Sequence, residues 1–368
     1  MLALRHGRAG TAGGPQHPSA PIQFILTALT CLPLATAMVH ADRFIPEEGT
    51  MFEHVLIPLD GSSLAECVLP HGVAVATAQG ARATVLQVVE QARGAGRSSA
   101  VDLLEWHYSE AQAGAYLQEV AERLRAAGLP ATQALLQGDP AERVIEHAEA
   151  EHADLILLSS HGRSGLSGWN VSSVVQKILA RAYVSILLIP AYHPPTKEIT
   201  ALRYERILVP LDGSPRAECV LPLAATLAAR HESQVLLTHV VHRPELPRRA
   251  PPSREDLDLA NTLAERNRIE ASRYLEEVRS RLSVSAEICL QVEDHVSATL
   301  QRLVLDRRVD LVLLSAHGYS GETRWPYGSL ATSFILYGST PLLIVQDLPR
   351  GAIEPTAAEL AAREFGHH

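Results

Sequence analysis

Short aliphatic runs alternate along the chain with longer segments whose apolar residues recur at helical spacing. The segment 102–127 places Leu103, Leu117, Val120 and Leu124 on one side of a predicted amphipathic helix. The aliphatic runs have the length of strands and almost no polar position, as expected of strands covered on both faces. In the first half of the chain the pattern predicts strands at 54–58, 83–89, 132–137, 155–159 and 185–189.

Helices are predicted between these strands, at 63–79, 102–127, 139–151 and 173–181. Asp139 followed by Pro140 is a strong start signal, because Asp caps free N–H groups and proline suits the first helical position. Regular alternation of strand and helix is typical of a parallel sheet with helices on both faces.

The second half of the chain repeats the first. The segment from Val55 to Pro70 recurs from Ile207 to Pro222, and 12 of its 16 positions are identical. A second block, from Asp154 to Gly165, recurs from Asp310 to Gly321. Order and spacing are kept, and intervals of about 150 residues indicate duplicated whole domains rather than a solenoid.

The repeat defines the domain organisation. We expect two equivalent domains joined by a polar, proline-bearing linker, with a leader before them and a short tail after them. The predicted bounds are 1–50 for the leader, 51–192 for the first domain, 193–203 for the linker, 204–348 for the second domain and 349–368 for the tail.

The leader allows three interpretations. Met51 stands just ahead of the first predicted strand, so residues 1–50 could be an over-extended reading frame, which is the interpretation we favour. Residues 22–41 are mostly apolar and could instead form a cleaved signal or a membrane anchor, although Pro33 weakens both alternatives. We therefore expect a cytoplasmic protein without a membrane partner, with export or anchoring through 22–41 as the alternative.

Composition excludes several classes of function. The net charge is −9, and the chain has no basic block, so a nucleic-acid partner is not expected. The four cysteines form no Cys-x-x-Cys pair, which argues against a zinc site or a redox dithiol. We interpret Cys67 and Cys219, which share one position of the repeat, as small buried hydrophobes.

Candidate ligand-binding residues follow two strands of each repeat, because ligands of open parallel sheets bind at the carboxyl ends of strands. After the first strand come Asp60-Gly-Ser62 and, in the second repeat, Asp212-Gly-Ser214. The glycine permits a tight turn, and the aspartate can accept a hydrogen bond from a ligand hydroxyl or coordinate a metal. The alternative is that the Asp and Ser only cap the next helix.

The second candidate segment is the loop after the fourth strand, which ends at a helix start in both repeats. Amide groups at a helix start attract an anion, glycines let the chain approach a phosphate closely, and serine hydroxyls add hydrogen-bond donors. A plain surface loop of small residues is the alternative. The candidate residues are Ser159, Gly162, Ser172 and Ser173 in the first repeat and Ser315, Gly318, Gly328 and Ser329 in the second.

These paired blocks resemble the universal stress protein family, whose loop pattern Gly-x2-Gly-x9-Gly-Ser/Thr aligns with them without gaps. The resemblance covers nearly all of residues 51–347. It implies two tandem Rossmann-like (adenine nucleotide alpha hydrolase-like) domains, each an open five-stranded parallel sheet flanked by helices. It also implies ATP, with or without Mg²⁺, as the ligand. Asp60 and Asp212 match the family's first-strand aspartate, and Val88 and Val240 match the valine whose backbone meets adenine.

The chain departs from this pattern at several glycines. Ser159 and Ser315 replace the first glycine, and Ser172 replaces the third one in the first repeat. A serine forced to a positive φ would cost about 1 kcal/mol relative to glycine. ATP binding is therefore better supported in the second domain, which keeps Gly328.

The leading hypothesis is a non-enzymatic, ATP-binding or nucleotide-responsive regulator of the stress response. Family members form dimers, so the resemblance implies self-association, through an internal pseudo-dimer or a homodimer. A nucleotide-free interaction scaffold and a slow ATPase are the alternatives. Neither loop contains a lysine or a Gly-Lys-Ser/Thr motif, so turnover is not expected. His161 and His317, beside the loop glycines, are interpreted as structural.

Overall fold

The computed structural model describes residues 50–90, 100–163, 165, 171–191, 198–243, 253–319 and 326–348. All of these described residues belong to one compact unit. The predictions for the leader and for the tail lie outside the described residues. No helix among the described residues is long and apolar enough to cross a membrane.

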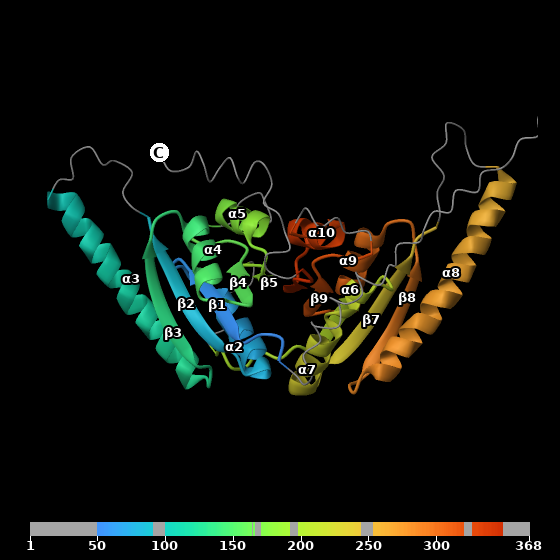
Figure 1. The fold of residues 1–368 in the computed structure, drawn as a ribbon, viewed down its shortest axis with the longest axis horizontal. Coiled ribbons are helices and arrows are strands. Elements are labelled where there is room, and N and C mark those ends of the chain that lie inside the picture. The colour runs from blue at the N-terminus through green and yellow to red at the C-terminus, as the bar shows by residue number, and fades with distance from the viewer. Residues whose placement is uncertain are drawn as a thin grey trace, which may run out of the picture. The chain divides into compact units, whose positions relative to one another are not determined.

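The first repeat contains five strands and the helices between them (Figure 1). In chain order its elements are β1 (His54–Leu59), the short 3-10 helix η2 (Ala65–Cys67), α2 (Val68–Gln79), β2 (Arg82–Val89), α3 (Ala100–Ala126), β3 (Ala131–Gln137), α4 (Pro140–Ala150), β4 (Leu155–Ser159), α5 (Ser173–Arg181) and β5 (Ser185–Ile189).

The second repeat follows the same order. Its elements are β6 (Arg206–Pro210), α6 (Pro215–Glu218), α7 (Leu221–His231), β7 (Gln234–Val241), α8 (Arg254–Arg281), β8 (Ala286–Val292), α9 (Val296–Asp306), β9 (Leu311–Ser315), α10 (Ser329–Tyr337) and β10 (Leu342–Val345).

The ten strands form a single sheet in the order β3-β2-β1-β4-β5-β10-β9-β6-β7-β8. Within each repeat all pairs are parallel, as predicted. The prediction of two separate five-stranded sheets is refined at one junction, because β5 pairs with β10 in antiparallel orientation. The edge that each repeat would leave open at this strand is thus covered by the other repeat.

The junction has a symmetric register. Leu187 pairs with Leu343, while Ile186 pairs with Ile344 and Leu188 with Leu342. Leu187 and Leu343 occupy the same position of the repeat, so the pair lies on a pseudo-two-fold axis. Both side chains are fully buried.

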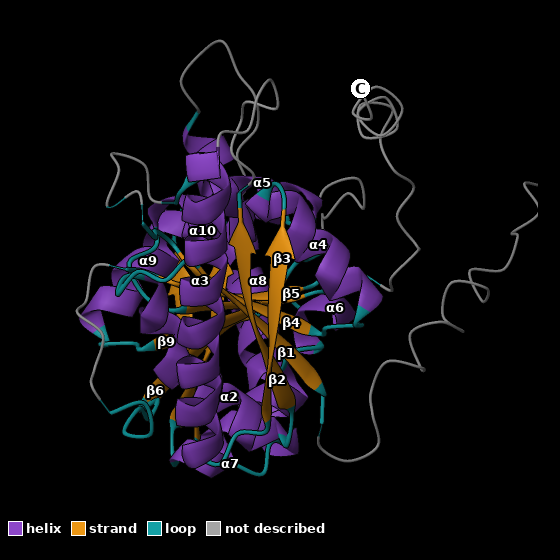
Figure 2. Cartoon of the chain, turned by 90° about the vertical axis from the view of Figure 1, so that its left-hand side faces the viewer, coloured by secondary structure: helices purple, strands orange, loops and turns teal. Residues whose placement is uncertain are grey.

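Two hydrophobic layers cover the sheet, one on each face. Residues of α2, α3, α7 and α8 pack with alternate strand positions such as Val55 and Ile57 in one layer. Residues of α4, α5, α9 and α10 pack with the intervening positions, such as Leu56, in the other. Figure 2 shows α3 lying along the sheet in a view turned by 90°. Strand alternation therefore sends neighbouring side chains to opposite layers, as expected when both faces are covered.

Polar contacts also join the repeats. The buried Tyr204 hydroxyl hydrogen-bonds His71 Nδ1 at 2.8 Å, and His231 Nε2 lies 3.3 Å from the carbonyl oxygen of Ala74. The pKa of His71 is lowered to about 4 by burial, so this ring is neutral near pH 7. The contacts place α2 and α7, which are equivalent helices, against each other.

Most predicted elements agree with the structure to within one or two residues. The exception is the first helix, predicted at 63–79. The chain instead makes the turn η2 and starts α2 at Val68. Pro70, which lacks an N–H group, falls in the first turn of α2, where that group needs no helical partner. The second repeat shows the same break between α6 and α7, with Pro222 near the start of α7.

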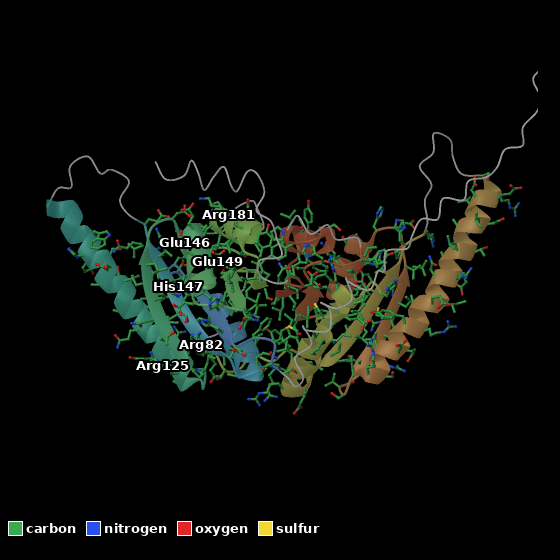
Figure 3. All side chains as sticks on the ribbon, in the orientation of Figure 1. Arg82, Arg125, Glu146, His147, Glu149 and Arg181 are labelled. Carbon is green, nitrogen blue, oxygen red and sulfur yellow. The ribbon has the colours of Figure 1, made fainter. Side chains whose placement is uncertain are left out.

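The predicted cap at Asp139 is confirmed, and it links α4 to α5. The carboxylate accepts hydrogen bonds from the N–H groups of Ala141 and Glu142, and Lys177 of α5 lies 3.2 Å from it. Arg181 of α5 and Glu142 of α4 form a second ion pair at 3.6 Å. Figure 3 labels Arg181 and, on α4, Glu146.

Replacing Asp139 with alanine should lower the free energy of unfolding by about 1 kcal/mol at pH 7. Partial burial alone would raise the pKa of Asp139, but its hydrogen bonds and Lys177 lower it further than burial raises it. The cap therefore stabilises the fold above the ordinary Asp pKa of about 3.9 and loses this effect as the pH falls through the lower, folded-state value. Urea unfolding at several pH values measures the difference. Asp139→Asn, which keeps the cap, should cost less than alanine at pH 7, and equal losses would contradict the assignment.

Candidate functional site

Each repeat has one pocket at the carboxyl ends of its parallel strands. The volumes are about 480 Å³ in the first repeat and about 530 Å³ in the second. All twelve candidate residues line them: Asp60, Val88, Ser159, Gly162, Ser172 and Ser173 in the first pocket, and Asp212, Val240, Ser315, Gly318, Gly328 and Ser329 in the second. The structure thus brings each set of six together.

The turn after the first strand is tight in both repeats. Gly61 and Gly213 have φ angles of 78° and 84°, in the region that favours glycine. The following serines cap the next turn, with Ser214 Oγ accepting from the N–H of Ala217 at 3.1 Å. Capping therefore explains the serine of the Asp-Gly-Ser motif, whereas the aspartate also makes contacts outside this turn.

Each aspartate joins the first-strand turn to the loop after the fourth strand. Asp60 Oδ1 accepts from the N–H of Ser62 at 2.9 Å, while its Oδ2 accepts from the backbone N–H of Arg163. In the second repeat Asp212 Oδ2 accepts from the N–H of Tyr319 at 2.6 Å. The pKa of Asp212 is lowered: burial alone would raise it, but hydrogen bonds from Ser214 and Tyr319 outweigh that effect.

The glycines of the loop are explained by these carboxylates. A Cβ atom at Gly162 would overlap Asp60 Oδ2, and one at Gly318 would overlap Asp212 Oδ2. Neither glycine has a positive φ. In this structure the two glycines let the loop approach the aspartate closely. From the sequence, we had expected them to let the loop approach a phosphate.

The end of each loop leads into a helix whose N-terminus faces the pocket. Ser172 and Gly328 both have φ angles of −70°, which any residue adopts without strain. The cost of about 1 kcal/mol expected for a serine at a positive φ therefore does not apply to Ser172. Both residues donate their N–H to the carbonyl oxygen of the residue that follows the preceding strand. Ser172 donates to Ser160, after β4, at 2.8 Å, and Gly328 donates to Ala316, after β9, at 2.7 Å. The two loops therefore close in the same way.

The two helix starts differ in one respect. Ser172 Oγ accepts from the N–H of Val175 at 3.4 Å, whereas Gly328 has no side chain to cap α10. The first N–H groups of any helix lack helical partners. The second pocket therefore presents one more amide group that is not engaged by a cap.

Beneath the first pocket, Ser159 connects the strand ends. Its hydroxyl lies 3.0 Å from the carbonyl oxygen of Leu64 and 2.6 Å from that of His161, and Cys67 Sγ donates to it at 3.4 Å. Burial raises the pKa of the Cys67 thiol, and that of Cys219 is raised to about 12. Both thiols are therefore protonated near pH 7, and Cys67 is buried as interpreted, whereas Cys219 is only partly buried.

The histidines beside the glycines are buried but have different partners. His161 Nδ1 lies 3.1 Å from Ser160 Oγ, which also accepts from the N–H of Ala191 at 2.9 Å. His317 Nδ1 lies 2.7 Å from the buried carboxylate of Asp347, whose other oxygen is 3.5 Å from Arg216. A hydroxyl in one repeat is thus replaced by a buried ionisable group in the other.

Three polar residues, which the sequence did not single out, also line the pockets. Arg163 brings a cation to the first pocket, where its guanidinium donates to the carbonyl oxygen of Asp60 at 2.5 Å. Gln87 and His239 occupy equivalent positions on β2 and β7, next to the valines. Among the described residues, Gln87 Oε1 and His239 Nδ1 are buried without a hydrogen-bond partner. Their position, one residue before each candidate valine, was the available signal.

The arrangement fits a ligand with both polar and apolar parts. A volume of several hundred Å³, an apolar lining and a few convergent polar groups are typical of small-molecule sites. The first strand stops pairing with β2 at Leu59 and Gln87, so Val88 lies beyond the last residue of β2 that pairs with β1, while it still pairs with Leu136 of β3. The described residues contain no group of three or more His, Cys, Asp or Glu side chains that could hold a metal ion.

Several known proteins of similar sequence or fold are named universal stress proteins. A universal stress protein of Thermus aquaticus, encoded in the QAH/OAS sulfhydrylase 3′ region, is 32% identical over 145 residues, which are 38% of this chain and 99% of the relative. A universal stress protein structure from Archaeoglobus fulgidus covers 81% of this chain and 100% of its own, with 19% identity and a TM-score of 0.55. A universal stress protein in complex with cAMP covers 38% of this chain and 98% of its own, with 20% identity and a TM-score of 0.31.

A sequence model of the universal stress protein family matches twice, at residues 51–190 and 203–346. The two matches coincide with the two repeats and together span most of the chain. The protein therefore belongs to the universal stress protein family.

Proposed function

We propose that this protein is a non-enzymatic regulator that binds ATP in both pockets and responds to it through the contact between its repeats. The observation that carries the proposal is the convergence of all twelve candidate residues on two equivalent pockets, each closed by a helix N-terminus. Free amide groups and the helix dipole attract phosphate oxygens. Asp60 and Asp212 supply acceptors for ligand hydroxyls, and the backbone of Val88 and Val240 meets the base.

The second pocket is proposed as the stronger phosphate site. Gly328 leaves the first amide groups of α10 unoccupied by a side-chain cap, whereas Ser172 engages the N–H of Val175. The first pocket offers Arg163 in compensation. Mg²⁺ would arrive with the nucleotide, because phosphate oxygens and one or two carboxylates are its usual ligands.

We further propose that the tandem repeats act as an internal pseudo-dimer. The symmetric β5–β10 junction and the packing of α2 against α7 connect the two halves through equivalent elements. A ligand that orders the loop after β4 or β9 acts directly beside this junction, since β4 pairs with β5 and β9 pairs with β10. That proximity gives nucleotide binding a physical route to the interface.

Calorimetric titration of the purified chain with ATP, with and without Mg²⁺, tests the function. Two saturable sites without phosphate release are expected. Phosphate release at a steady rate would favour a slow ATPase, and absence of binding by the folded protein would favour a scaffold. Titration with cAMP, which lacks the β- and γ-phosphates, measures how much of the affinity depends on the helix N-termini.

Alanine at either loop glycine should remove one site and leave the other. Gly162→Ala forces the Asp60 carboxylate away from the first loop, and Gly318→Ala does the same to Asp212. We expect each variant to bind ATP with half the wild-type stoichiometry. Gly114→Ala is the matched control, because an added Cβ there meets nothing within 4 Å. Full stoichiometry in both loop variants would contradict the assignment of the pockets.

A further inference from the structure

Each pocket has a buried hydrogen-bond acceptor that lacks a partner at the same place in the repeat. The atoms are Gln87 Oε1 and His239 Nδ1, both without a partner within the described part of the chain. Gln87 is 7% exposed, and both residues line their pockets. A buried polar atom without a partner is costly, which makes two at equivalent positions unusual. A ligand that donates a hydrogen bond there would relieve the cost in both repeats.

The two residues offer the same chemistry at neutral pH by different means. The Nδ1 atom of His239 is buried and has no hydrogen-bond partner among the described residues. A neutral imidazole carries one N–H and one lone pair, so with the hydrogen on Nε2 the ring presents a lone pair on Nδ1. Gln87 presents an amide oxygen instead. Both positions therefore act as acceptors.

The location of these acceptors indicates which part of a nucleotide they meet. Gln87 and His239 directly precede Val88 and Val240, the proposed base contacts, and they lie beside the first-strand turn. The Gln87 amide is 3.8 Å from a Cβ placed on Gly61, and Asp212 acts electrostatically on His239. The helix N-termini proposed for the phosphates lie across the pocket. The group between base and phosphates is the sugar, whose hydroxyls are donors.

We propose that Gln87 and His239 each accept a hydrogen bond from a ribose hydroxyl, and that the histidine makes nucleotide binding in the second pocket sensitive to acid while the first pocket is not. This inference rests on the proposed ATP binding and adds to it a sugar-recognition residue and a difference between the pockets.

The sign of the pH effect follows from the acceptor. Burial lowers the pKa of His239, and the Leu211 carbonyl and Asp212 raise it by less. His239 is therefore neutral at pH 7, and binding weakens only as the pH falls below the ordinary histidine pKa of about 6.5. Protonation puts a hydrogen on Nδ1 and removes the acceptor. Linkage then limits the loss to about tenfold for each pH unit below the pKa of the free protein.

Other ionisable groups at the same end of the second repeat define the controls. Asp212, in the turn after β6, acts electrostatically on His239, and Tyr274 of α8 and Glu218 of α6 interact with each other beside Asp212. Two further pairs are Arg243 with Asp294, which follow β7 and β8, and His317 with Asp347, which follow β9 and β10. The pKa of Asp212 is lowered, so its charge does not change between pH 5 and 8. Removing His239 alone separates its titration from the others.

The sugar contact is tested with nucleotide analogues. ATP, 2′-deoxy-ATP and 3′-deoxy-ATP are titrated at pH 7.5 into Gly162→Ala, which retains the second pocket, and into Gly318→Ala, which retains the first. At least one deoxy analogue should bind about tenfold more weakly than ATP in each background. His239→Leu and Gln87→Leu, made in the matching backgrounds, should bind ATP about tenfold more weakly and lose the discrimination. Discrimination that persists unchanged would overturn the sugar contact.

The pH dependence is tested by exchanging the two residues. Between pH 7.5 and 5.0, ATP affinity should fall further in the second pocket than in the first. His239→Gln should abolish this excess, and Gln87→His should create it in the first pocket. His107→Gln, at a surface histidine 60% exposed, should leave the profile unchanged. The ligand's own protonation is common to all titrations.

The outcomes separate this inference from the proposed function. If neither pocket binds ATP at pH 7.5 while the protein is folded, the proposed function fails. If both pockets bind ATP but the exchange variants keep the wild-type pH profiles, the role of His239 is wrong and ATP binding stands.

Discussion

Replacing Asp347 with alanine is expected to lower the free energy of unfolding by about 1–3 kcal/mol. The Asp347 carboxylate lies 2.7 Å from His317 Nδ1, and the two side chains are 2% and 0% exposed. Removing one member of such a buried hydrogen-bonded pair takes this hydrogen bond from the other where water cannot replace it. Chemical denaturation of the variant and the wild type measures the loss.

The first repeat provides the rescue for this variant. There, Ser160 and Ala191 occupy the positions of Ala316 and Asp347, and the serine hydroxyl serves both the histidine and the N–H of Ala191. Adding Ala316→Ser to Asp347→Ala should therefore recover a large part of the stability. A loss below about 1 kcal/mol for Asp347→Ala alone, or a double variant no more stable than the single one, would contradict the importance of the pair.

Leu187→Ala and Leu343→Ala should each cost about 2–5 kcal/mol, because both leucines are fully buried at the centre of the sheet. The two are direct partners in the β5–β10 register and belong to the same hydrophobic layer. We therefore expect the double variant to differ from the sum of the single variants by more than about 0.5 kcal/mol. Denaturation of all four proteins gives this coupling energy.

Leu275→Ala is the matched control for the junction. Leu275 is equally buried, but it belongs to α8, which packs on β7 and β8. Its loss should add to that of Leu187→Ala without coupling. Coupling between Leu187 and Leu275 as large as that between Leu187 and Leu343 would show that the junction is not a distinct energetic unit.

The alternation of strands and helices in each repeat was predictable, because buried parallel strands and amphipathic helices have distinct periods. The helix start at Asp139-Pro140 was predictable for a different reason, because helix capping depends only on residues next to each other in the sequence. The break between η2 and α2 was not predicted, because the apolar spacing continues through it and only Pro70 marks the change.

The joining of the two sheets could not be predicted from strand periodicity. The sequence of β5 is apolar at four of its five positions, but it does not say which strand covers its second side. That information lies in the long-range pairing of Leu187 with Leu343. Pairing of this kind depends on the geometry of both halves together rather than on any local pattern.

The sequence predicted which residues form the candidate site, but it did not predict the contacts between them. The motif placed Gly162 and Gly318 in the loops, but their contact with the aspartates needs three-dimensional knowledge. The expected strain at Ser172 rested on an assumed backbone angle, and the observed φ of −70° suits any residue. Gln87 and His239 were missed because a lone polar residue in a strand carries no signal until its neighbours are known.

The covalent junction of the repeats frees each half to change alone. In an assembly of two identical chains every substitution appears in both copies, so both cavities must change together. Here one gene encodes both sides of the axis through Leu187 and Leu343, and one repeat has His239 where the other has Gln87. A single molecule thus combines two unlike pockets in a fixed one-to-one ratio.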